Sequence, residues 1–555
     1  MVSTTDKVVL YQIFTRTFGN KNLTRKENGS YAENGAGKMN DIDAQVLRQV
    51  RRLGITHVWY TGIIRHATTT DYSCYGIPTQ HPAVVKGKAG SPYAIVDYYD
   101  VDPDLAVEVP QRMEEFRSLV IRTHAEGLKV VIDFVPNHVA REYKSVNKPS
   151  GVLDLGEKDD ARCHFSAQNN FYYCPGEHFE PCFDKGDYEE FPAKCTGNDH
   201  FDSHPGMNDW YETIKLNYGI DYTGGGARHF NPVPPTWKKM VDILLFWSAM
   251  GVDGFRCDMV EMVPTEFWAY AAQRLRTEYP EIILIGEVYN PGLYRDYLAA
   301  GFDYLYDKVG MYDTVRGVMC GWCPAGNITG QWQATNDIQD RMLYFLENHD
   351  EQRIASDYFC GDARKGVPGL IVSALLRTNP VMIYAGQEFG ERGMDKEGFS
   401  GCDGRSTIFD YWTVDAVYRG YFERAALTES AQQLESVYSQ ILNLARKEKA
   451  FREGEMFDLM YANGENGDFN PHRQFAFLRK KDDELILVVA NFSAEKASLR
   501  VVIPSHAFDF FGIEEGMRTG EELLSGCVRT NEWKRDGHIP VEVDGYSGAI
   551  IKCKV

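Results

Sequence analysis

The sequence predicts an α/β protein: a (β/α)8 TIM barrel with an inserted subdomain after its third strand and an antiparallel β-sandwich at its C-terminal end. Three observations lead to this fold class. Short apolar runs rich in β-branched residues alternate with helix-period segments over most of the chain, which is typical of a parallel sheet. One long polar stretch interrupts this rhythm, and alternating runs replace it near the C-terminal end.

Eight apolar runs are the predicted barrel strands, because each is short, β-branched and bounded by turn residues. They are Val8–Ile13, Ile55–Tyr60, Val130–Val135, Val252–Arg256, Ile282–Gly286, Asp303–Tyr306, Met342–Leu346 and Val381–Tyr384. The sixth run has the weakest pattern. Helices are predicted between the strands; one opens at Pro110 and ends at Gly127, since proline favours the first helical position and glycine follows the last.

The stretch of residues 139–216 is rich in Gly, Pro, Asp, Asn, Cys and aromatic residues. A free loop of this length is uncommon inside a compact domain, so we predict an inserted subdomain there. The barrel would then comprise residues 1–138 and 217–450. Residues 451–555 would form the sandwich, on the evidence of the runs Gln474–Leu478, Leu485–Ala490, Leu499–Ile503 and Ala549–Lys552.

The composition excludes some functions. With 59 Lys and Arg against 79 Asp and Glu, the net charge is −20, which disfavours nucleic acids and anionic membranes as partners. No run approaches the roughly 20 apolar residues of a membrane span. The first residues, MVSTTDKVVLYQ, show no cationic and apolar leader. We therefore expect a cytoplasmic protein, or one whose leader has been removed. The oligomeric state is not predicted.

Twelve cysteines are few for a chain of 555 residues, so a disulfide scaffold is not expected. Four of them cluster in the polar stretch, where reduced thiols are favoured over one or two disulfides and over a zinc site. The pair Cys320 and Cys323 has CxxC spacing, but no clear strand precedes it and no clear helix follows it. A redox role for this pair is therefore disfavoured.

Polar residues follow four of the predicted strands. They are the segments Asp133–His138, Arg256–Asp258, Gly286–Glu287 and Glu347–Asp350. The C-terminal ends of barrel strands meet at one mouth, where catalysis takes place. One such residue alone is commonly a hydrogen-bonded strand end, but four groups at the same mouth indicate an active site.

In order, these segments resemble the four conserved regions of the α-amylase superfamily, glycoside hydrolase family 13. Four other stretches add to the resemblance, which then covers most of residues 8–390. They are Leu10-Tyr-Gln-Ile-Phe14, Gly54-Ile-Thr-His-Val-Trp-Tyr60, Ser91-Pro-Tyr93-Ala-Ile-Val-Asp97 and Ala385-Gly-Gln-Glu-Phe-Gly390. The resemblance implies a barrel with an inserted domain B and a C-terminal domain C, as the residue patterns also predict.

The resemblance also implies roles for the carboxylates. Asp258 would be the nucleophile, Glu287 the acid/base, and Asp350 a third carboxylate that binds sugar hydroxyls and favours a distorted ring. Retaining glycosidases need two carboxyl groups roughly 5 Å apart. Arg256 lies two residues before Asp258 on the same strand, so both side chains point to one side. A guanidinium there would keep Asp258 ionised and orient it.

The remaining roles are those of substrate binding. His138 and His349 would donate hydrogen bonds to the same sugar, and Tyr93 would stack beneath it. Two departures from the family pattern stand out: Glu261-Met262 replaces the Lys-His that often follows the nucleophile motif, and Pro205-Gly-Met-Asn208 replaces Pro-Asp-Leu-Asn. Asn137 and Asn208 could bind a structural calcium, but weakly, because few acidic residues accompany them. No cofactor is expected to be required.

We therefore predict a glycosidase that hydrolyses α-1,4-glucans, such as starch, or maltooligosaccharides. The alternatives within the superfamily are an α-glucan transglycosylase and a small-oligosaccharide α-glucosidase. A barrel that only binds carbohydrate is a third possibility from another functional class. Such proteins typically lose the nucleophile or the acid, whereas Asp258, Glu287 and Asp350 are all present here. The site, more than the fold, decides between these functions.

Overall fold

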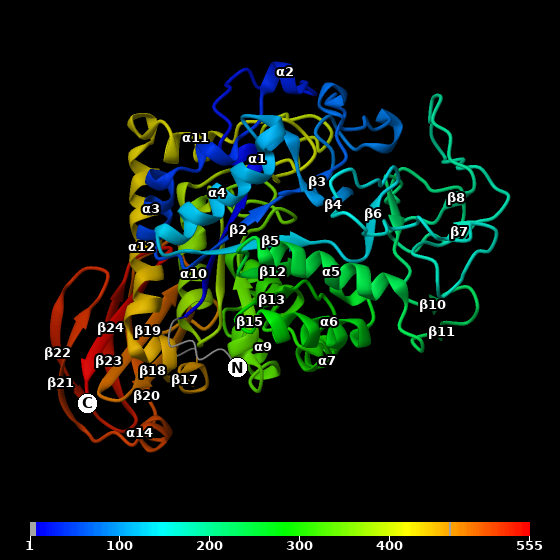
Figure 1. The fold of residues 1–555 in the computed structure, drawn as a ribbon. Helices are drawn as coiled ribbons and strands as arrows, with labels where there is room; N and C mark the ends of the chain where they lie inside the picture. The colour runs from blue at the N-terminus through cyan, green and yellow to red at the C-terminus, as the bar shows by residue number, and fades with distance from the viewer. Residues whose placement is uncertain (1–6, 465–467) are drawn as a thin grey trace.

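The computed structural model describes residues 7–464 and 468–555. Eight parallel strands close into a barrel in the order β1-β16-β15-β14-β13-β12-β5-β2 (Figure 1). The predicted barrel is confirmed, and no strand end differs from its prediction by more than two residues. The strands are β1 Val9–Phe14, β2 His57–Thr61, β5 Lys129–Phe134, β12 Gly254–Cys257, β13 Ile283–Gly286, β14 Tyr304–Tyr306, β15 Met342–Phe345 and β16 Val381–Tyr384.

Helices surround the barrel and bury their apolar faces against it. The longer ones are α3 Ala44–Arg52, α4 Arg112–Ala125, α5 Pro235–Ala249, α6 Thr265–Glu278, α10 Gly366–Leu375 and α12 Glu429–Lys447. The predicted start of α4 was wrong by two residues. Pro110 lies in a 3-10 turn, Val109–Gln111, and the α-helix begins only after it. Phe116, Leu119 and Val120 form its buried face.

After β5 the chain leaves the barrel and forms three small two-stranded sheets (Figure 1). They pair β6 (His138–Ala140) with β9 (Thr213–Lys215), β7 (Tyr173–Cys174) with β8 (Ala193–Lys194), and β10 (Ile220–Asp221) with β11 (Ala227–Arg228). A separate small core holds the segment together, with Tyr172, Phe179 and Cys195 among its buried members. The pairing of β6 with β9 brings both ends of the insertion back to the mouth of the barrel.

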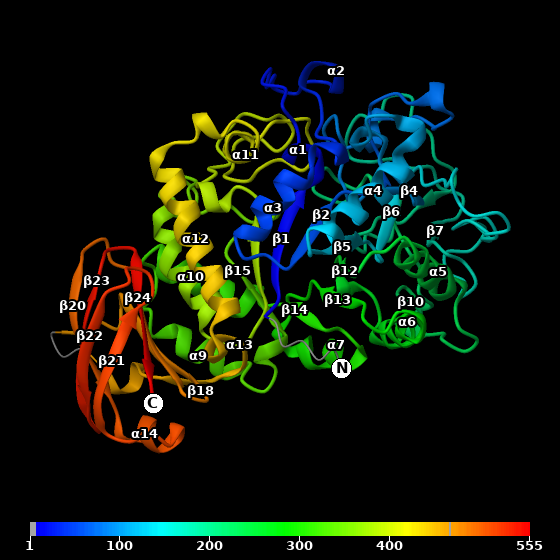
Figure 2. The same cartoon turned by 60° about the vertical axis from the view of Figure 1, so that its left-hand side comes forward.

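At the other side of the barrel lies a C-terminal β-domain (Figures 1 and 2). A six-stranded antiparallel sheet has the order β17-β18-β19-β24-β21-β22, and β20 pairs with β23. The strands are β17 Glu455–Asp458, β18 Gln474–Lys481, β19 Glu484–Asn491, β20 Ala497–Ile503, β21 Gly516–Glu522, β22 Val528–Trp533, β23 Gly537–Val543 and β24 Ser547–Lys554. The sequence patterns had indicated four of these strands and had missed the helix α14, Ser505–Phe511.

One buried arginine fastens this domain to the barrel. Arg479 on β18 is 0% exposed. Its guanidinium donates to the carbonyls of Leu375 and Leu376 at the end of α10, at 3.1 and 2.9 Å. It also donates to the carbonyls of Phe451 and Gly454, at 3.3 and 2.8 Å. The guanidinium of Arg479 thus donates to four backbone carbonyls, away from the residues that line the mouth of the barrel.

The cysteines are all free thiols in the structure. Two pairs lie in contact: the sulfur atoms of Cys174 and Cys195 are 3.9 Å apart, and those of Cys320 and Cys360 are 3.8 Å apart. The neighbour of Cys320 is therefore Cys360 and not its CxxC partner. Among the described residues, no group of three or more His, Cys, Asp or Glu side chains could hold a metal ion. No helix in the described ranges is long and apolar enough to cross a membrane.

Candidate active site

The predicted carboxylates meet at the C-terminal mouth of the barrel. Asp258 follows β12, Glu287 follows the adjacent strand β13, and Asp350 lies in the loop after β15. All three line one cavity of about 220 Å³, together with Tyr93 and His138. The parallel pairing of β12 with β13 sets Cys257 beside Gly286, so the next residue of each strand is directed to the same mouth.

Arg256 contacts two of these carboxylates at once. Its side chain is fully buried. One terminal nitrogen, Nη1, donates to Oδ1 of Asp258 at 2.7 Å, and the other, Nη2, forms an ion pair with Oε1 of Glu287, also at 2.7 Å. Asp133 lies 3.6 Å from Nη1. The planar fork of a guanidinium suits such bridging, and it places both carboxyl groups within the reach of one side chain.

Glu287 has two further partners that were not predicted from the sequence. The hydroxyl of Tyr289 donates to Oε1 at 2.7 Å, and the backbone N–H of Met259 donates to Oε2 at 2.9 Å. Met259 has a φ of 43°, a left-handed conformation that costs a non-glycine residue about 1–2 kcal/mol. This strained turn after the predicted nucleophile directs an amide hydrogen to Glu287. Tyr289 stands two residues after Glu287, and this spacing is the signal in the sequence that could have indicated their contact.

His349 is held between Gln12 and Tyr93. The Nε2 atom of Gln12 lies 2.8 Å from Nδ1 of His349, and because an amide nitrogen only donates, Nδ1 accepts and Nε2 carries the proton. That Nε2 lies 2.5 Å from the Tyr93 hydroxyl and 3.1 Å from Oδ2 of Asp350. Burial lowers the pKa of His349 well below its ordinary value. The ring is therefore a neutral hydrogen-bond donor with a fixed orientation.

The inserted segment supplies the opposite side of the cavity. His138 on β6 is buried, which lowers its pKa to about 3, and its ring lies 5.2 Å from that of Trp210. Lys86 and Glu212 form an ion pair of 3.0 Å that also lines the cavity. Trp210, Lys86 and Glu212 were not predicted as site residues from the sequence. No motif marks them: Trp210 and Glu212 belong to the insertion, Lys86 belongs to the segment between β2 and β5, and only the fold brings them to the same cavity.

Burial alters the acidity of the carboxylate cluster. Desolvation, and then the charge of Glu287, raise the pKa of Asp258 well above its ordinary value, while Arg256 opposes the rise. Desolvation and Glu287 also raise the pKa of Asp350. Arg256 orients Asp258 as expected, but the effect of burial on the ionisation of Asp258 outweighs that of Arg256. Asp258 and Asp350 therefore retain a proton at a higher pH than isolated aspartates do.

Comparison with known proteins decides the family. The family model for the α-amylase catalytic domain matches residues 12–453, about four fifths of the chain. The chain belongs to the α-amylase family. It is accordingly a glycosidase, as its motifs had indicated.

Relatives of this α-amylase family member are distant in sequence. Neopullulanase 2 of Thermoactinomyces vulgaris is 21% identical, over 98% of this chain and 77% of that protein. The α-amylase MalA of Haloarcula japonica is 23% identical, over 97% of this chain and 61% of that protein. The intracellular maltogenic amylase of Bacillus subtilis is 22% identical, over 69% of this chain and 56% of that enzyme. The chain thus spans less than two thirds of the latter two proteins.

Solved structures share the fold. A maltogenic α-amylase, AmyB from Thermotoga neapolitana, superposes with a TM-score of 0.64 at 19% identity, covering 99% of both chains. An α-amylase from Geobacillus thermoleovorans, complexed with acarbose, superposes with a TM-score of 0.65 at 18% identity, again over 99% of both chains. The arrangement of barrel, insertion and C-terminal sheet is therefore that of known α-amylases.

In this α-amylase family member, a lysine side chain occupies the site beside Asn137 where a calcium ion had been considered. The amide oxygen of the buried Asn137 accepts a hydrogen bond of 2.7 Å from Nζ of Lys215, which also forms a 2.5 Å ion pair with Asp199. Asn208 lies on an exposed loop. The residues at Asn137 thus surround an ammonium group and do not fit a calcium ion.

Proposed function

We propose that this chain hydrolyses α-1,4-glucans or maltooligosaccharides with retention of configuration, through a covalent glycosyl-enzyme intermediate. The observation that carries the proposal is the contact of one guanidinium, that of Arg256, with both Asp258 and Glu287 at 2.7 Å. Retaining enzymes hold their two carboxyl groups about 5 Å apart, whereas inverting enzymes leave about 6.5–9.5 Å for a water molecule. Bridging by one side chain favours the shorter separation.

In the first step, an oxygen of Asp258 attacks the anomeric carbon while Glu287 protonates the departing glycosidic oxygen. The hydrogen bond from Arg256 goes to Oδ1 of Asp258, so Oδ2 is the oxygen that attacks. In the second step, Glu287 removes a proton from water, and that water displaces Asp258. Glu287 thus gives up a proton in the first step and regains one from water in the second, so the acid is restored in each turnover.

The sugar that is cleaved would lie against Tyr93, His349 and His138. The neutral, fixed imidazole of His349 can donate to a sugar hydroxyl, and Asp350 can accept from one. The names of the relatives, which include α-amylases, a neopullulanase and maltogenic amylases, support an α-glucan substrate. They do not favour the transglycosylase or small-oligosaccharide alternative. The convergence of three carboxylates on one cavity speaks against a barrel that only binds carbohydrate.

We also propose that the enzyme needs no calcium at Asn137, since the ammonium of Lys215 already neutralises that site. An intracellular location is proposed as well, supported by the similarity to the intracellular maltogenic amylase of Bacillus subtilis.

The test is digestion of a panel comprising starch, pullulan, cyclodextrins, sucrose and maltooligosaccharides, with chromatography of the products. We expect shorter maltooligosaccharides from starch or from longer maltooligosaccharides, and no release by the Asp258→Asn variant. Cleavage of sucrose alone, or transfer products in place of hydrolysis products, would contradict the proposed substrate and reaction.

A further inference from the structure

A buried arginine outside the cavity joins two loops that form one side of it. Arg16 lies in the short helix α1 (Thr15–Phe18) just after β1, and it is 2% exposed. Its Nη1 donates to the carbonyl of Ala89 at 2.7 Å, and its Nη2 donates to the carbonyls of Gly90 and Ile408 at 3.0 and 2.5 Å. One guanidinium therefore binds chain segments that are more than 300 residues apart.

These carbonyls lie directly beside residues that line the active-site cavity. Ser91 and Tyr93 follow Gly90, and Phe409 follows Ile408; together Ser91, Tyr93, Ile408 and Phe409 form what we call the tyrosine wall. The backbone N–H of Ala89 also donates to the carbonyl of Phe409 at 3.0 Å. The two loops are thus linked to each other as well as to Arg16, and they form a single unit.

The loops approach so closely that glycine is required. Gly90 has a φ of 74°, and a Cβ atom there would lie 1.7 Å from the carbonyl oxygen of Ala67. Gly87 has a φ of 65°, and a Cβ there would lie 2.3 Å from the carbonyl oxygen of Phe409. Non-glycine residues would meet both strain and overlap at these positions. The loops beside the tyrosine wall are therefore packed tightly against neighbouring backbone in the position that Arg16 holds.

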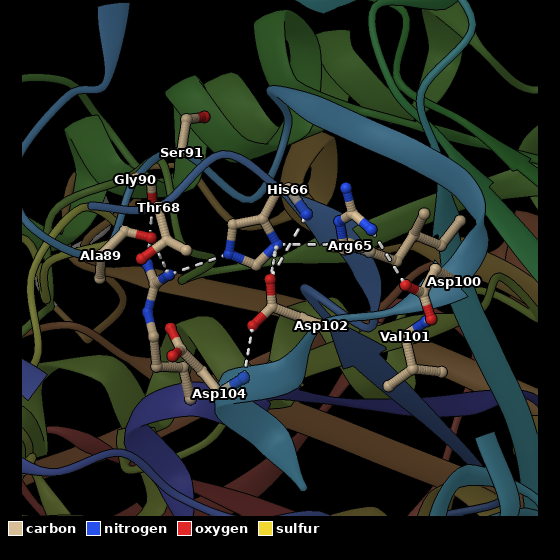
Figure 3. A network of polar contacts seen from close by, with 12 residues as sticks. Arg65, His66, Thr68, Ala89, Gly90, Ser91, Asp100, Val101, Asp102 and Asp104 are labelled. Atoms are coloured by element: carbon tan, nitrogen blue, oxygen red, sulfur yellow. Dashed lines mark hydrogen bonds and ion pairs between the residues drawn. The ribbon is translucent and has the colours of Figure 1, made fainter. Parts of the chain in front are cut away.

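The ring of His66 lies between the guanidinium of Arg16 and the carboxylate of Asp102. Figure 3 shows His66 between the contacts at Ala89 and Gly90 and the carboxylate of Asp102. The Nε2 atom lies 3.0 Å from Nη1 of Arg16, and Nδ1 lies 3.2 Å from Oδ2 of Asp102. Burial lowers the pKa of His66 to about 3, so the neutral ring accepts from Arg16 at Nε2 and donates from Nδ1 to the backbone carbonyl of Ile64, at 3.1 Å. This fixes the orientation of the guanidinium.

We propose that Arg16 is a positioning residue for substrate binding, which holds the tyrosine wall in the place where Tyr93 meets His349 and the sugar. The inference rests on the proposed function, because it takes Tyr93 as a substrate contact. The hydroxyl of Tyr93 lies 2.5 Å from Nε2 of His349. A shift of the wall would break this contact and open the cavity, without removing any group that touches the reacting atoms.

The chain offers a matched control in Arg479. It is as buried as Arg16, and it too donates to several backbone carbonyls, but it joins the C-terminal domain to α10 and contacts no residue of the cavity. Arg16→Gln and Arg479→Gln should both lower the melting temperature. Only Arg16→Gln should change the binding of substrate in the protein that remains folded.

The experiment compares KM, kcat and melting temperature for wild type, Arg16→Gln, Arg16→Lys and Arg479→Gln, with the best maltooligosaccharide of the panel. Loss of a residue that orients the ligands of a metal site typically costs about 10- to 100-fold, and we take the same order of magnitude for Arg16. We expect kcat/KM of Arg16→Gln to fall by about that factor, mainly through KM, with partial recovery in Arg16→Lys. We expect the KM of Arg479→Gln to stay within about twofold of the wild type. If Arg16→Gln does not fold, Arg16→Lys carries the comparison.

A double-mutant cycle shows whether Arg16 acts through Tyr93. If it does, Arg16→Gln should add little to the loss caused by Tyr93→Ala. An unchanged KM in folded Arg16→Gln and Arg16→Lys, or fully additive losses in the double mutant, would overturn the inference. A wild-type enzyme inactive on every glucan would instead overturn the proposed function, so the two failures are distinguishable.

Discussion

Replacing Arg256 with lysine should lower kcat about 10- to 150-fold while leaving the enzyme folded. The guanidinium uses one nitrogen for Asp258 and the other for Glu287. A lysine ammonium keeps the charge, but as a single point it cannot hold both carboxylates in the same arrangement. One charge-assisted contact would be lost, worth about 1.5–3 kcal/mol. At about 1.4 kcal/mol for each tenfold change in rate, this gives the stated range.

The assay is release of reducing ends from a maltooligosaccharide at several concentrations, so that kcat and KM are obtained separately. The effect should fall mainly on kcat, because Arg256 is fully buried and acts through the carboxylates. Arg479→Lys, a substitution of an equally buried arginine outside the site, serves as the control and should leave kcat near the wild-type value. An Arg256→Lys enzyme with kcat within twofold of the wild type, or with a change in KM alone, would refute the reasoning.

Three further predictions concern the same enzyme. Asp258→Asn should abolish turnover, by about 10⁴-fold or more, as expected for the nucleophile of a covalent mechanism; near-native activity of the folded variant would disprove the assignment. A chelator should leave the melting temperature unchanged, because Lys215 supplies the cation at Asn137, and a large drop would reveal a calcium site. Burial raises the pKa of Asp258, and protonation of Asp258 removes the nucleophile. On acidification, activity should therefore begin to fall at a pH above the ordinary pKa of aspartate, about 3.9. A rate that is still maximal at pH 4 would contradict this.

The barrel could be predicted from the sequence because its strands carry a local signal. Buried parallel strands are continuous apolar runs, and each is followed by polar residues at the mouth. Asp258 and Glu287 therefore stand at recognisable places, at the ends of β12 and β13. The start of α4 and the presence of α14 were not predictable in the same way. Pro110 fits a 3-10 turn as well as a helix start, and seven residues are too few to show a helical period.

The contacts that complete the site depend on packing between distant segments. Gln12 and His349 are 337 residues apart, and Lys215 and Asn137 are 78 apart. No local pattern in the sequence links such pairs.

The configuration of the first product tests the central claim most directly. Asp258 attacks one face of the anomeric carbon, and water assisted by Glu287 then attacks the opposite face, so two inversions restore the original configuration. Proton NMR of the anomeric region in the first minutes of hydrolysis, before mutarotation, distinguishes the two outcomes. The account predicts that the α-anomer appears first at the new reducing end. A β-anomer as the initial product of an α-linked substrate would contradict the covalent mechanism and the roles proposed for Asp258, Glu287 and Arg256.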